Sequence, residues 1–253
     1  MKKKYKALLL DVDGTLIPNK RDGMPSEKVT RAIKEASKLI YVGLATSRPY
    51  SMLSHIYNHL DLSGPSIINS GSQIIDIKSR KIYIEHLLPE KEVFQICKIL
   101  LKFKKPIIIN DGEEDVEFSK TYKPHQPLNI FMFSLDEKIA DEIIEIVSNI
   151  PTITIFKIPD WSGGERVGIA VSHLHGTKQH GVLEVAKLLN INTHEIIGVG
   201  DGQNDFPLLM ACGLKVAMGN AMSDLKEIAD YIAPKVENDG VADVIEKFIT
   251  NNK

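Results

Sequence analysis

The chain is organised around the stretch Leu8-Leu9-Leu10-Asp11-Val12-Asp13-Gly14-Thr15. A short apolar run that stops at a turn signal is typical of a buried strand in a parallel sheet. Ligands of open α/β sheets bind at the carboxyl ends of such strands. We therefore predict that Asp11 and Asp13 lie at the mouth of a site. Gly14 allows the backbone to turn sharply away from the strand.

Asp11 and Asp13 repel each other when both are ionised. At a separation of about 5 Å and an effective dielectric constant near 20, the repulsion costs roughly 3 kcal/mol. A raised pKa, a basic partner or a hard cation such as Mg²⁺ offsets such a cost. On this stretch alone a second interpretation is equally open, in which both residues only cap a turn, as Asp-Gly pairs often do.

Length and composition set the class of protein. The 253 residues allow one large domain or two modest ones, and 43% hydrophobic and 25% charged residues are ordinary for a globular protein with a core. The net charge of −2 provides no global attraction for nucleic acid. Cys97 and Cys212 both occur in apolar helical contexts, which favours buried free thiols in a reducing compartment.

The N-terminal residues 1–4 are basic, as at the start of a signal peptide, but the apolar run that follows stops at Asp11 and is too short for one. No stretch approaches the roughly 18 apolar residues of a membrane span. We therefore expect a soluble cytoplasmic protein.

Strand and helix patterns alternate in the first and last thirds of the chain. Apolar runs predict strands at 8–10, 39–45, 67–69, 195–200 and 214–217, and helical spacing predicts helices that follow Ser26 and Pro49 and cover 177–189, 208–211, 223–229 and 241–249. This alternation predicts an α/β fold with a doubly wound, Rossmann-like parallel sheet.

The middle of the chain follows another pattern. Residues 73–77 and 81–85 read as an antiparallel hairpin, and they precede predicted helices at 89–104 and 136–149 and strands at 106–110, 127–134, 152–158 and 166–171. We predict a core domain formed by residues 1–81 and 173–253, interrupted by an inserted α+β domain at 82–172.

Further strand and helix ends carry polar side chains. Asp201 and Asp205 follow the strand at 195–200, so with Asp11 and Asp13 they are expected to form an anionic cluster that needs a cation. Oxygen-only ligands favour Mg²⁺ over zinc. Asn204 or Asp205 is a candidate cap for the next helix.

Thr46 and Ser47 end the strand at 39–45 just before a predicted helix, where their hydroxyls and the helix amides suit a phosphate; a plain helix cap is about as good an interpretation. Lys178 lies in the first turn of a helix, where a positive charge is unfavourable to the helix dipole.

This constellation resembles the haloacid dehalogenase superfamily, in particular its Cof-type, sugar-phosphatase-like members with a large α/β cap (subclass IIB). Residues 11–15 resemble the first motif, Thr46 the second, Lys178 the third and residues 200–205 the fourth. Segments 216–221 and 238–240 also resemble stretches of these phosphatases. Ser47 and Gln179 depart from the pattern, because glycine commonly follows the Thr and a small residue often follows the Lys.

The resemblance implies a chemistry. Asp11 would attack phosphorus and form an aspartyl-phosphate, and Asp13 would protonate the leaving oxygen and then deprotonate water. Mg²⁺ would be held by Asp11, the backbone carbonyl of Asp13, Asp201 and, directly or through water, Asp205. The phosphate-binding residues would be Thr46, Ser47, Lys178 and Asn204.

We therefore expect a Mg²⁺-dependent phosphatase of small phosphorylated metabolites, with sugar phosphates as the first candidates. The alternatives are a phosphomutase acting on hexose phosphates and a non-catalytic phospho-acceptor of the receiver type. No nucleic-acid or membrane partner is expected, and the protein would be a monomer or a homodimer. His173, His175 and His180 lie close in sequence and could ligate a metal, but we interpret them as incidental histidines of a surface loop.

Overall fold

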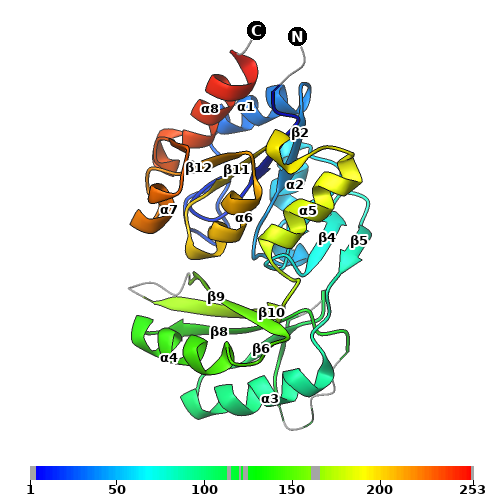
Figure 1. The fold of residues 1–253 in the computed structure, drawn as a ribbon, viewed down its shortest axis with the longest axis vertical. Coiled ribbons are helices and arrows are strands. Elements are labelled where there is room, and N and C mark those ends of the chain that lie inside the picture. Colours follow the sequence, from blue (N-terminus) through cyan, green and yellow to red (C-terminus); the bar gives the residue numbers. More distant parts are fainter. Residues whose placement is uncertain (1–3, 113–114, 120, 122–124, 161–165, 252–253) are drawn as a thin grey trace.

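A five-stranded parallel sheet forms the centre of the larger part of the molecule (Figure 1). The computed structural model describes residues 4–112, 115–119, 121, 125–160 and 166–251, so the basic residues 1–3 lie outside the described part. The strand order is β13-β12-β11-β1-β2, with β1 at Ala7–Leu10, β2 at Tyr41–Leu44, β11 at Ile196–Gly200, β12 at Leu214–Ala217 and β13 at Tyr231–Ile232. The predicted doubly wound sheet is confirmed.

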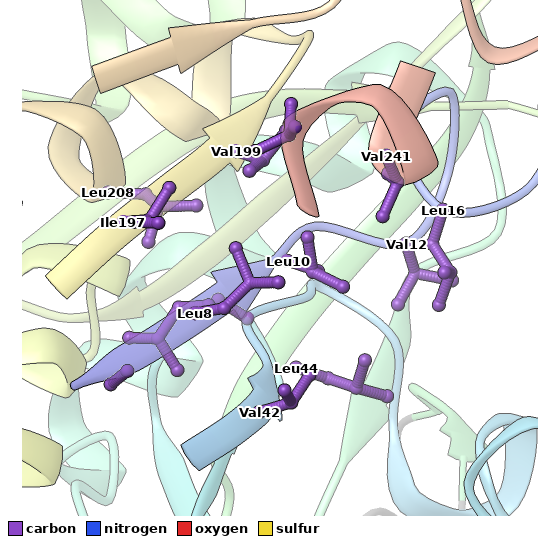
Figure 2. Close-up of a cluster of buried hydrophobic side chains, with 14 of the residues drawn as sticks. Leu8, Leu10, Val12, Leu16, Val42, Leu44, Ile197, Val199, Leu208 and Val241 are labelled. Carbon is purple, nitrogen blue, oxygen red and sulfur yellow. The ribbon is translucent and has the colours of Figure 1, made fainter. Parts of the chain in front are cut away.

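Strand β1 is buried along its whole length because both neighbours cover its edges and helices cover its faces. Its register aligns Leu8 with Val42 and Ile197, and Leu10 with Leu44 and Val199. Figure 2 shows these side chains packed together with Leu208 and Val241 from two helices. The apolar run at the start of the chain therefore forms the middle of the core.

Helices pack on both sides of this sheet (Figure 1). They are α1 (Glu27–Ser37), α2 (Ser54–Leu60), α5 (Lys178–Leu189), α6 (Phe206–Ala211), α7 (Ser223–Glu227) and α8 (Gly240–Ile245), which a π-helix continues at Glu246–Thr250. Ser26 caps α1 as predicted, because its hydroxyl accepts a hydrogen bond from Val29 N. The helix predicted from Pro49 begins instead with a 3₁₀ turn at Tyr50–Met52, and α2 starts only at Ser54.

A three-stranded antiparallel sheet lies beside the parallel one. It consists of β3 (Ser66–Ile68), β4 (Gln73–Asp76) and β5 (Lys81–Glu85), so the predicted hairpin is confirmed. The prediction that residues 67–69 continue the parallel sheet is only partly correct. A single parallel bridge joins Ile67 to Ala45, whereas the ladder of β3 runs antiparallel to β4.

The inserted segment forms its own sheet, in the order β7-β6-β8-β10-β9. Its elements are β6 (Ile108–Asn110), β7 (Asp115–Glu117), β8 (Asn129–Leu135), β9 (Ile153–Pro159), β10 (Val167–His173), α3 (Glu90–Leu100) and α4 (Glu137–Val147). Both helices cover the face of this sheet that points away from the core (Figure 1). Strand β7 was not predicted from the sequence.

The other face of the inserted sheet points toward the core and carries Phe131, Phe133 and Ile158. A β-bulge in β8 sets Phe133 and Ser134 opposite Gly168, and Ser134 takes a left-handed φ of 58°. A Cβ atom on Gly168 would lie 2.8 Å from the ring of Phe133. Glycine therefore lets this ring lie close to the backbone of the neighbouring strand.

The chain passes between the two parts twice, after β5 and after β10. Because β5 stays paired with β4 up to Glu85, the first passage begins four residues after the proposed boundary at 81–82. The division into a core of 1–81 and 173–253 and an insert of 82–172 otherwise stays a prediction. None of the helices in the described ranges combines the length and hydrophobicity that crossing a bilayer requires.

Candidate active site

Three strand ends converge at one edge of the parallel sheet. Because Leu10 pairs with both Leu44 and Val199, the residues that follow these strands come together: Asp11 after β1, Thr46 after β2 and Asp201 after β11. Backbone hydrogen bonds fix this alignment, with Asp11 N donating to Val199 O and Ala45 N donating to Leu10 O. This is the edge at which the sequence predicted a site.

A buried lysine lies among three carboxylates. Oxygens of Asp11, Asp201 and Asp205 all lie within 4.8 Å of one another. Lys178 Nζ donates to Asp11 Oδ1 at 2.6 Å and to Asp205 Oδ1 at 2.5 Å, and its side chain is only 1% exposed. Asp11 and Asp205 therefore compensate the positive charge of Lys178, which is unfavourable at the N-terminus of α5.

Burial and mutual repulsion shift the pKa values of this cluster. Burial, followed by the charge of Asp205, raises the pKa of Asp11 well above its usual value, although Lys178 opposes this. The same two causes raise the pKa of Asp201 to about 7. Burial alone would lower the pKa of Lys178, but Asp11 and Asp205 outweigh it and raise that pKa. When all three carboxyl groups are ionised, the cluster therefore carries more negative charge than one ammonium group neutralises.

Local backbone structure positions Lys178. Thr177 caps α5 by accepting a hydrogen bond from His180 N, which fixes the first turn of the helix. Gly71, at a φ of 111°, bridges to Thr177 so closely that a Cβ atom would lie 2.2 Å from the Thr177 carbonyl carbon. On the same helix, Gly181 lies directly against the side chain of Ile67. Two glycines thus allow α5 to approach β3 and aim Lys178 at Asp11.

Asp205 is completely enclosed by donors. Its Oδ2 accepts from the backbone N–H groups of Asp201 and Gly202 at 2.9 and 3.0 Å, while Oδ1 accepts from Lys178. It precedes α6 but makes no side-chain bond to that helix, so the expected capping role is wrong. Asp205 instead stabilises the turn that contains Asp201 and Gly202, and it binds the ammonium group of Lys178.

The carboxylate of Asp13 does not join the others. Arg48 Nε donates to its Oδ2 at 2.8 Å and Arg48 Nη2 to its Oδ1 at 2.7 Å, with both side chains buried. Arg48 also donates to the carbonyls of Lys20 and Arg21 in the loop after β1. The expected four-carboxylate cluster is therefore a cluster of three beside a separate Arg48–Asp13 ion pair. Sequence reasoning gave Arg48 no role, although a basic residue two positions after Thr46 was a usable signal.

Thr46, Ser47 and Asn204 line a small cavity together with Asp11, Asp13, Asp201 and Gly202. Thr46 Oγ1 accepts from Arg48 N, and Ser47 Oγ accepts from Asn204 Nδ2 at 3.0 Å. Each hydroxyl therefore keeps its proton to donate to a ligand. The predicted α-helix does not start directly after these residues, since only a 3₁₀ turn follows Pro49 and α2 begins at Ser54. A phosphate here would therefore contact the hydroxyls and not the amides of an α-helix.

Two further residues contact the cluster and were not assigned a site role from the sequence. Thr15 Oγ1 donates to Asp201 Oδ1 at 2.8 Å. Asn220 Nδ2 donates to Gly14 O at 2.7 Å and lies 3.4 Å from Asp201 Oδ2. Because Asn220 follows the end of β12, the rule that found Asp11 and Asp201 also applies to it.

The cluster suits a hard divalent cation. All its ligand atoms are carboxylate oxygens, which Mg²⁺ prefers, and they carry excess negative charge. Gly14 supports this assignment, because a Cβ atom there would lie 2.2 Å from Asp201 Oδ2. Only glycine allows the Asp201 carboxylate to approach the backbone that follows Asp13. Asp11, Asp201, the backbone carbonyl of Asp13 and, at the rear, Asp205 are the residues that would hold the ion.

The sequence matches the profile of haloacid dehalogenase-like hydrolases over residues 8–116 and 110–245. The chain belongs to this family. The match spans both halves of the core, including the positions of Asp11, Thr46, Lys178 and Asp201.

Relatives of this haloacid dehalogenase-like hydrolase span its whole length. It is 27% identical over 248 residues to 5-amino-6-(5-phospho-D-ribitylamino)uracil phosphatase YcsE of Bacillus subtilis, covering 96% of each chain. It is 25% identical over 245 residues to phosphoglycolate phosphatase 1 of Saccharolobus solfataricus, again covering 96% of both. Its fold is similar to that of the subclass IIB sugar phosphatase BT4131, with a TM-score of 0.79 at 22% identity over 96% of this chain and 98% of that one.

The raised pKa of Asp201 predicts how pH and Mg²⁺ affect stability. Without a cation, folded Asp201 keeps its proton up to about pH 7, whereas an unfolded Asp loses it near pH ~3.9. Folding then takes up a proton between these values, so the free energy of unfolding falls as pH rises from about 4 to 7. At about pH 8 we expect Mg²⁺ at ~100 times its Kd to raise the free energy of unfolding by ~2.7 kcal/mol, and at about pH 5.5 the same Mg²⁺ concentration should raise it by less.

Thermal melting with Mg²⁺ and with EDTA at both pH values measures this difference. The variant Asp201→Asn serves as the control, since it should lose most of the Mg²⁺ effect. Equal stabilisation by Mg²⁺ at both pH values would contradict the assignment of the cation to this cluster.

Gly71→Ala should displace Lys178, although Gly71 itself does not contact the acidic cluster. The new Cβ atom would collide with the backbone of Thr177 and move the first turn of α5, so we expect a loss of roughly 1–3 kcal/mol in stability and a lower kcat. Gly64→Ala is the matched control, because Gly64 also has a positive φ of 92°, but the nearest neighbour of a Cβ atom there would be the Tyr41 side chain at 3.0 Å and not backbone. Denaturation curves and turnover of both variants test this; equal kcat values would show that Gly71 does not position Lys178.

Proposed function

We propose that this hydrolase is a Mg²⁺-dependent phosphatase of small phosphorylated metabolites that works through an aspartyl-phosphate on Asp11. The observation that carries the proposal is the carboxylate of Asp11 at the end of β1, bound to a buried ammonium and adjacent to Asp201. The names of relatives that span the whole chain, which include two phosphatases, support the same reaction.

In the first half of the reaction, a carboxylate oxygen of Asp11 forms a bond to phosphorus as the bond between phosphorus and the leaving oxygen breaks. Asp13 gives its proton to that leaving oxygen, and the alcohol departs. Lys178 uses two of its three N–H donors on Asp11 and Asp205, so the third is available for a phosphoryl oxygen. The hydroxyls of Thr46 and Ser47 and the amide of Asn204 bind the other oxygens.

In the second half, Asp13 removes a proton from a water molecule, and the hydroxide oxygen bonds to phosphorus. The bond from phosphorus to Asp11 then breaks, which releases inorganic phosphate and restores both carboxyl groups. When bound, Mg²⁺ supplies positive charge that offsets the phosphoryl and carboxylate oxygens. Both Asp13 oxygens accept bonds from Arg48, so Asp13 reaches the substrate only after exchanging one of them. Arg48 is therefore a positioning residue.

The leaving group would face the inserted sheet. A cavity of about 50 Å³ is lined by Asp13, Ser47, Arg48, Pro49 and Met52 of the core and by Asp115, Phe131, Phe133 and Ile158 of the insert. The two Phe rings lie nearly parallel, with centroids 6.0 Å apart. Sugar phosphates remain candidates, but this wall favours a phosphorylated metabolite that also presents an apolar or planar surface.

The substrate class, the cellular location and the oligomeric state belong to the same proposal. The substrate is a small molecule, with no nucleic acid or membrane involved, and the protein works in the cytoplasm as a monomer or homodimer. Substrates reach Asp13 between the core and the inserted sheet, which then acts as a cap.

Replacing the nucleophile tests the reaction. Asp11→Asn should lower phosphate release from a panel of sugar phosphates and other metabolite phosphates roughly 10³-fold or more, because a carboxamide does not form the phosphoryl intermediate. EDTA should abolish release by the natural protein. Asp61→Asn is the matched control, since Asp61 is exposed, lies outside the site and has a φ of 53° that Asn tolerates.

Product analysis separates the alternatives. Free phosphate in proportion to alcohol supports the phosphatase, whereas an isomerised hexose phosphate with little free phosphate identifies a mutase. A long-lived phosphoryl group on Asp11 without turnover identifies a phospho-acceptor. Unimpaired turnover by Asp11→Asn would overturn the mechanism.

The apolar wall predicts a selective effect on binding. Phe133→Ser removes a ring from the cavity, so KM for phosphate esters with an aromatic leaving group should rise about tenfold or more. KM for glycerol phosphate should change little, since it offers no such surface. Phe94→Ser is the control, because Phe94 lies on α3, on the far side of the insert. Equal changes for both kinds of substrate would show that Phe133 does not contact the leaving group.

A further inference from the structure

Four of the eight histidines of the chain gather where the chain passes between core and insert. His86 directly follows β5 on the first connection, and His173 and His175 lie on the second, at and after the end of β10. His180 belongs to the first turn of α5, which the second connection enters (Figure 1). The sequence interpretation of incidental loop histidines omitted His86, which is about 90 residues away along the chain.

The four rings lie close to one another. The centroid of His86 is 5.8 Å from that of His173 and 5.9 Å from that of His175, and the latter two are 5.4 Å apart. His180 is closer still to His175, at 4.6 Å, with His175 Nδ1 and His180 Nε2 separated by 2.9 Å. Two imidazoles that share a tetrahedral metal ion at 2.0–2.1 Å have centroids about 5 Å apart. The observed spacing is close to that value.

The backbone and a neighbouring hydroxyl hold individual ring nitrogens. His175 N donates to His173 Nδ1 at 3.1 Å, and Thr177 Oγ1 lies 2.9 Å from His180 Nδ1. In His173 this leaves Nε2 as the nitrogen directed away from its own backbone, whereas His180 Nε2 faces His175 Nδ1. Fixing one imidazole nitrogen and presenting the other is how proteins orient histidine ligands.

The surroundings of His86, His173 and His180 favour the neutral form of these three rings. Burial, followed by the neighbouring histidines, lowers the pKa of His86, His173 and His180. The acidic groups that face the rings are Glu184, opposite His86 and His180, and Glu92, opposite His173, and they oppose this shift without overcoming it. Neutral imidazole is the form that binds metal ions.

We propose that His86, His173, His175 and His180 form a second metal site, which binds Zn²⁺ or a similar borderline divalent cation such as Ni²⁺ or Cu²⁺. The histidine nitrogens do not converge on one point in this structure, so metal binding requires His175 and His180 to exchange the bond between their rings for bonds to the ion, and the rings to turn about their side-chain bonds. Their half-buried to exposed positions allow this movement. Nitrogen-only ligands select these metals, whereas the all-oxygen cluster around Asp201 selects Mg²⁺. The two sites therefore discriminate between cations by ligand chemistry.

Such a site would connect the two passages of the chain. His86 lies on the first connection, and its backbone N–H donates a hydrogen bond to the backbone carbonyl of Ser72, which follows Gly71. His173 and His175 lie on the second connection, which leads to Lys178. A metal ion bound by both connections would restrict movement of the insert relative to the core. This inference does not depend on the reaction proposed above, because it concerns binding at a different set of residues.

Metal titration of the whole chain tests the proposal. With excess Mg²⁺ present to occupy the acidic cluster, calorimetry should detect one Zn²⁺ per chain, and Co²⁺ should give the visible absorption of tetrahedral nitrogen coordination. His86→Gln and His175→Gln should each weaken Zn²⁺ binding at least about tenfold, since each removes one ligand. Affinity should also fall as pH drops from about 7.5 to about 5.5, because protons compete for the imidazoles.

Matched variants make the result decisive. His55→Gln and His194→Gln remove exposed histidines elsewhere and should leave Zn²⁺ affinity unchanged. Melting curves without Zn²⁺ show that the ligand variants are folded. Zn²⁺ affinity that is unchanged in both His86→Gln and His175→Gln, or that is lost only in Asp201→Asn, would overturn the proposal. If the protein released no phosphate from any substrate, the Zn²⁺ titration would still decide whether the histidines bind a metal ion.

Discussion

The ammonium group of Lys178, buried between Asp11 and Asp205, is the interaction on which the site depends. It joins the end of β1, the turn after β11 and the start of α5, and it links residues 167 positions apart in the chain. Breaking one partner of a buried ion pair costs about 3–5 kcal/mol, because a charge is left without compensation. The lysine and the acidic turn come from the part of the chain after the insert, so the site forms only when both halves of the core have come together.

The inserted sheet contributes the opposite chemistry. The core edge presents charges and hydroxyls, whereas the sheet presents Phe131, Phe133 and Ile158. An apolar wall over a charged site excludes water. This strengthens the ion pair of Arg48 with Asp13, and it would strengthen the proposed interaction of Lys178 with a phosphoryl group. The bulge at Phe133 and the absence of a side chain at Gly168 determine where the Phe133 ring lies. The backbone of the insert therefore positions the apolar side chains that face the core.

Sequence patterns predicted the parts of the structure that follow from local rules. The ends of apolar strands located Asp11, Thr46 and Asp201, and helical spacing and capping located α1 and α5, because burial and strand direction act along short stretches. Contacts between distant side chains were not predictable in this way. Arg48 reaching Asp13, the antiparallel ladder of β3 and the approach of His86 to His173 depend on packing that one sequence does not reveal.

The repulsion between Asp11 and Asp13 shows how the fold solves a problem that the sequence poses. From the sequence alone, a shared Mg²⁺ was the expected answer, yet each carboxylate also has its own cation. Asp11 faces the compact ammonium of Lys178, which has a third donor to spare, whereas Asp13 accepts both arms of the Arg48 fork. In the proposed mechanism, the single ammonium of Lys178 leaves an oxygen of Asp11 able to attack phosphorus, whereas the two bonds from Arg48 would hold Asp13 until a substrate replaces one of them. The carboxylates of Asp11 and Asp13 lie only two positions apart in the chain, yet their different cations suit them to the different roles proposed for a nucleophile and a proton donor.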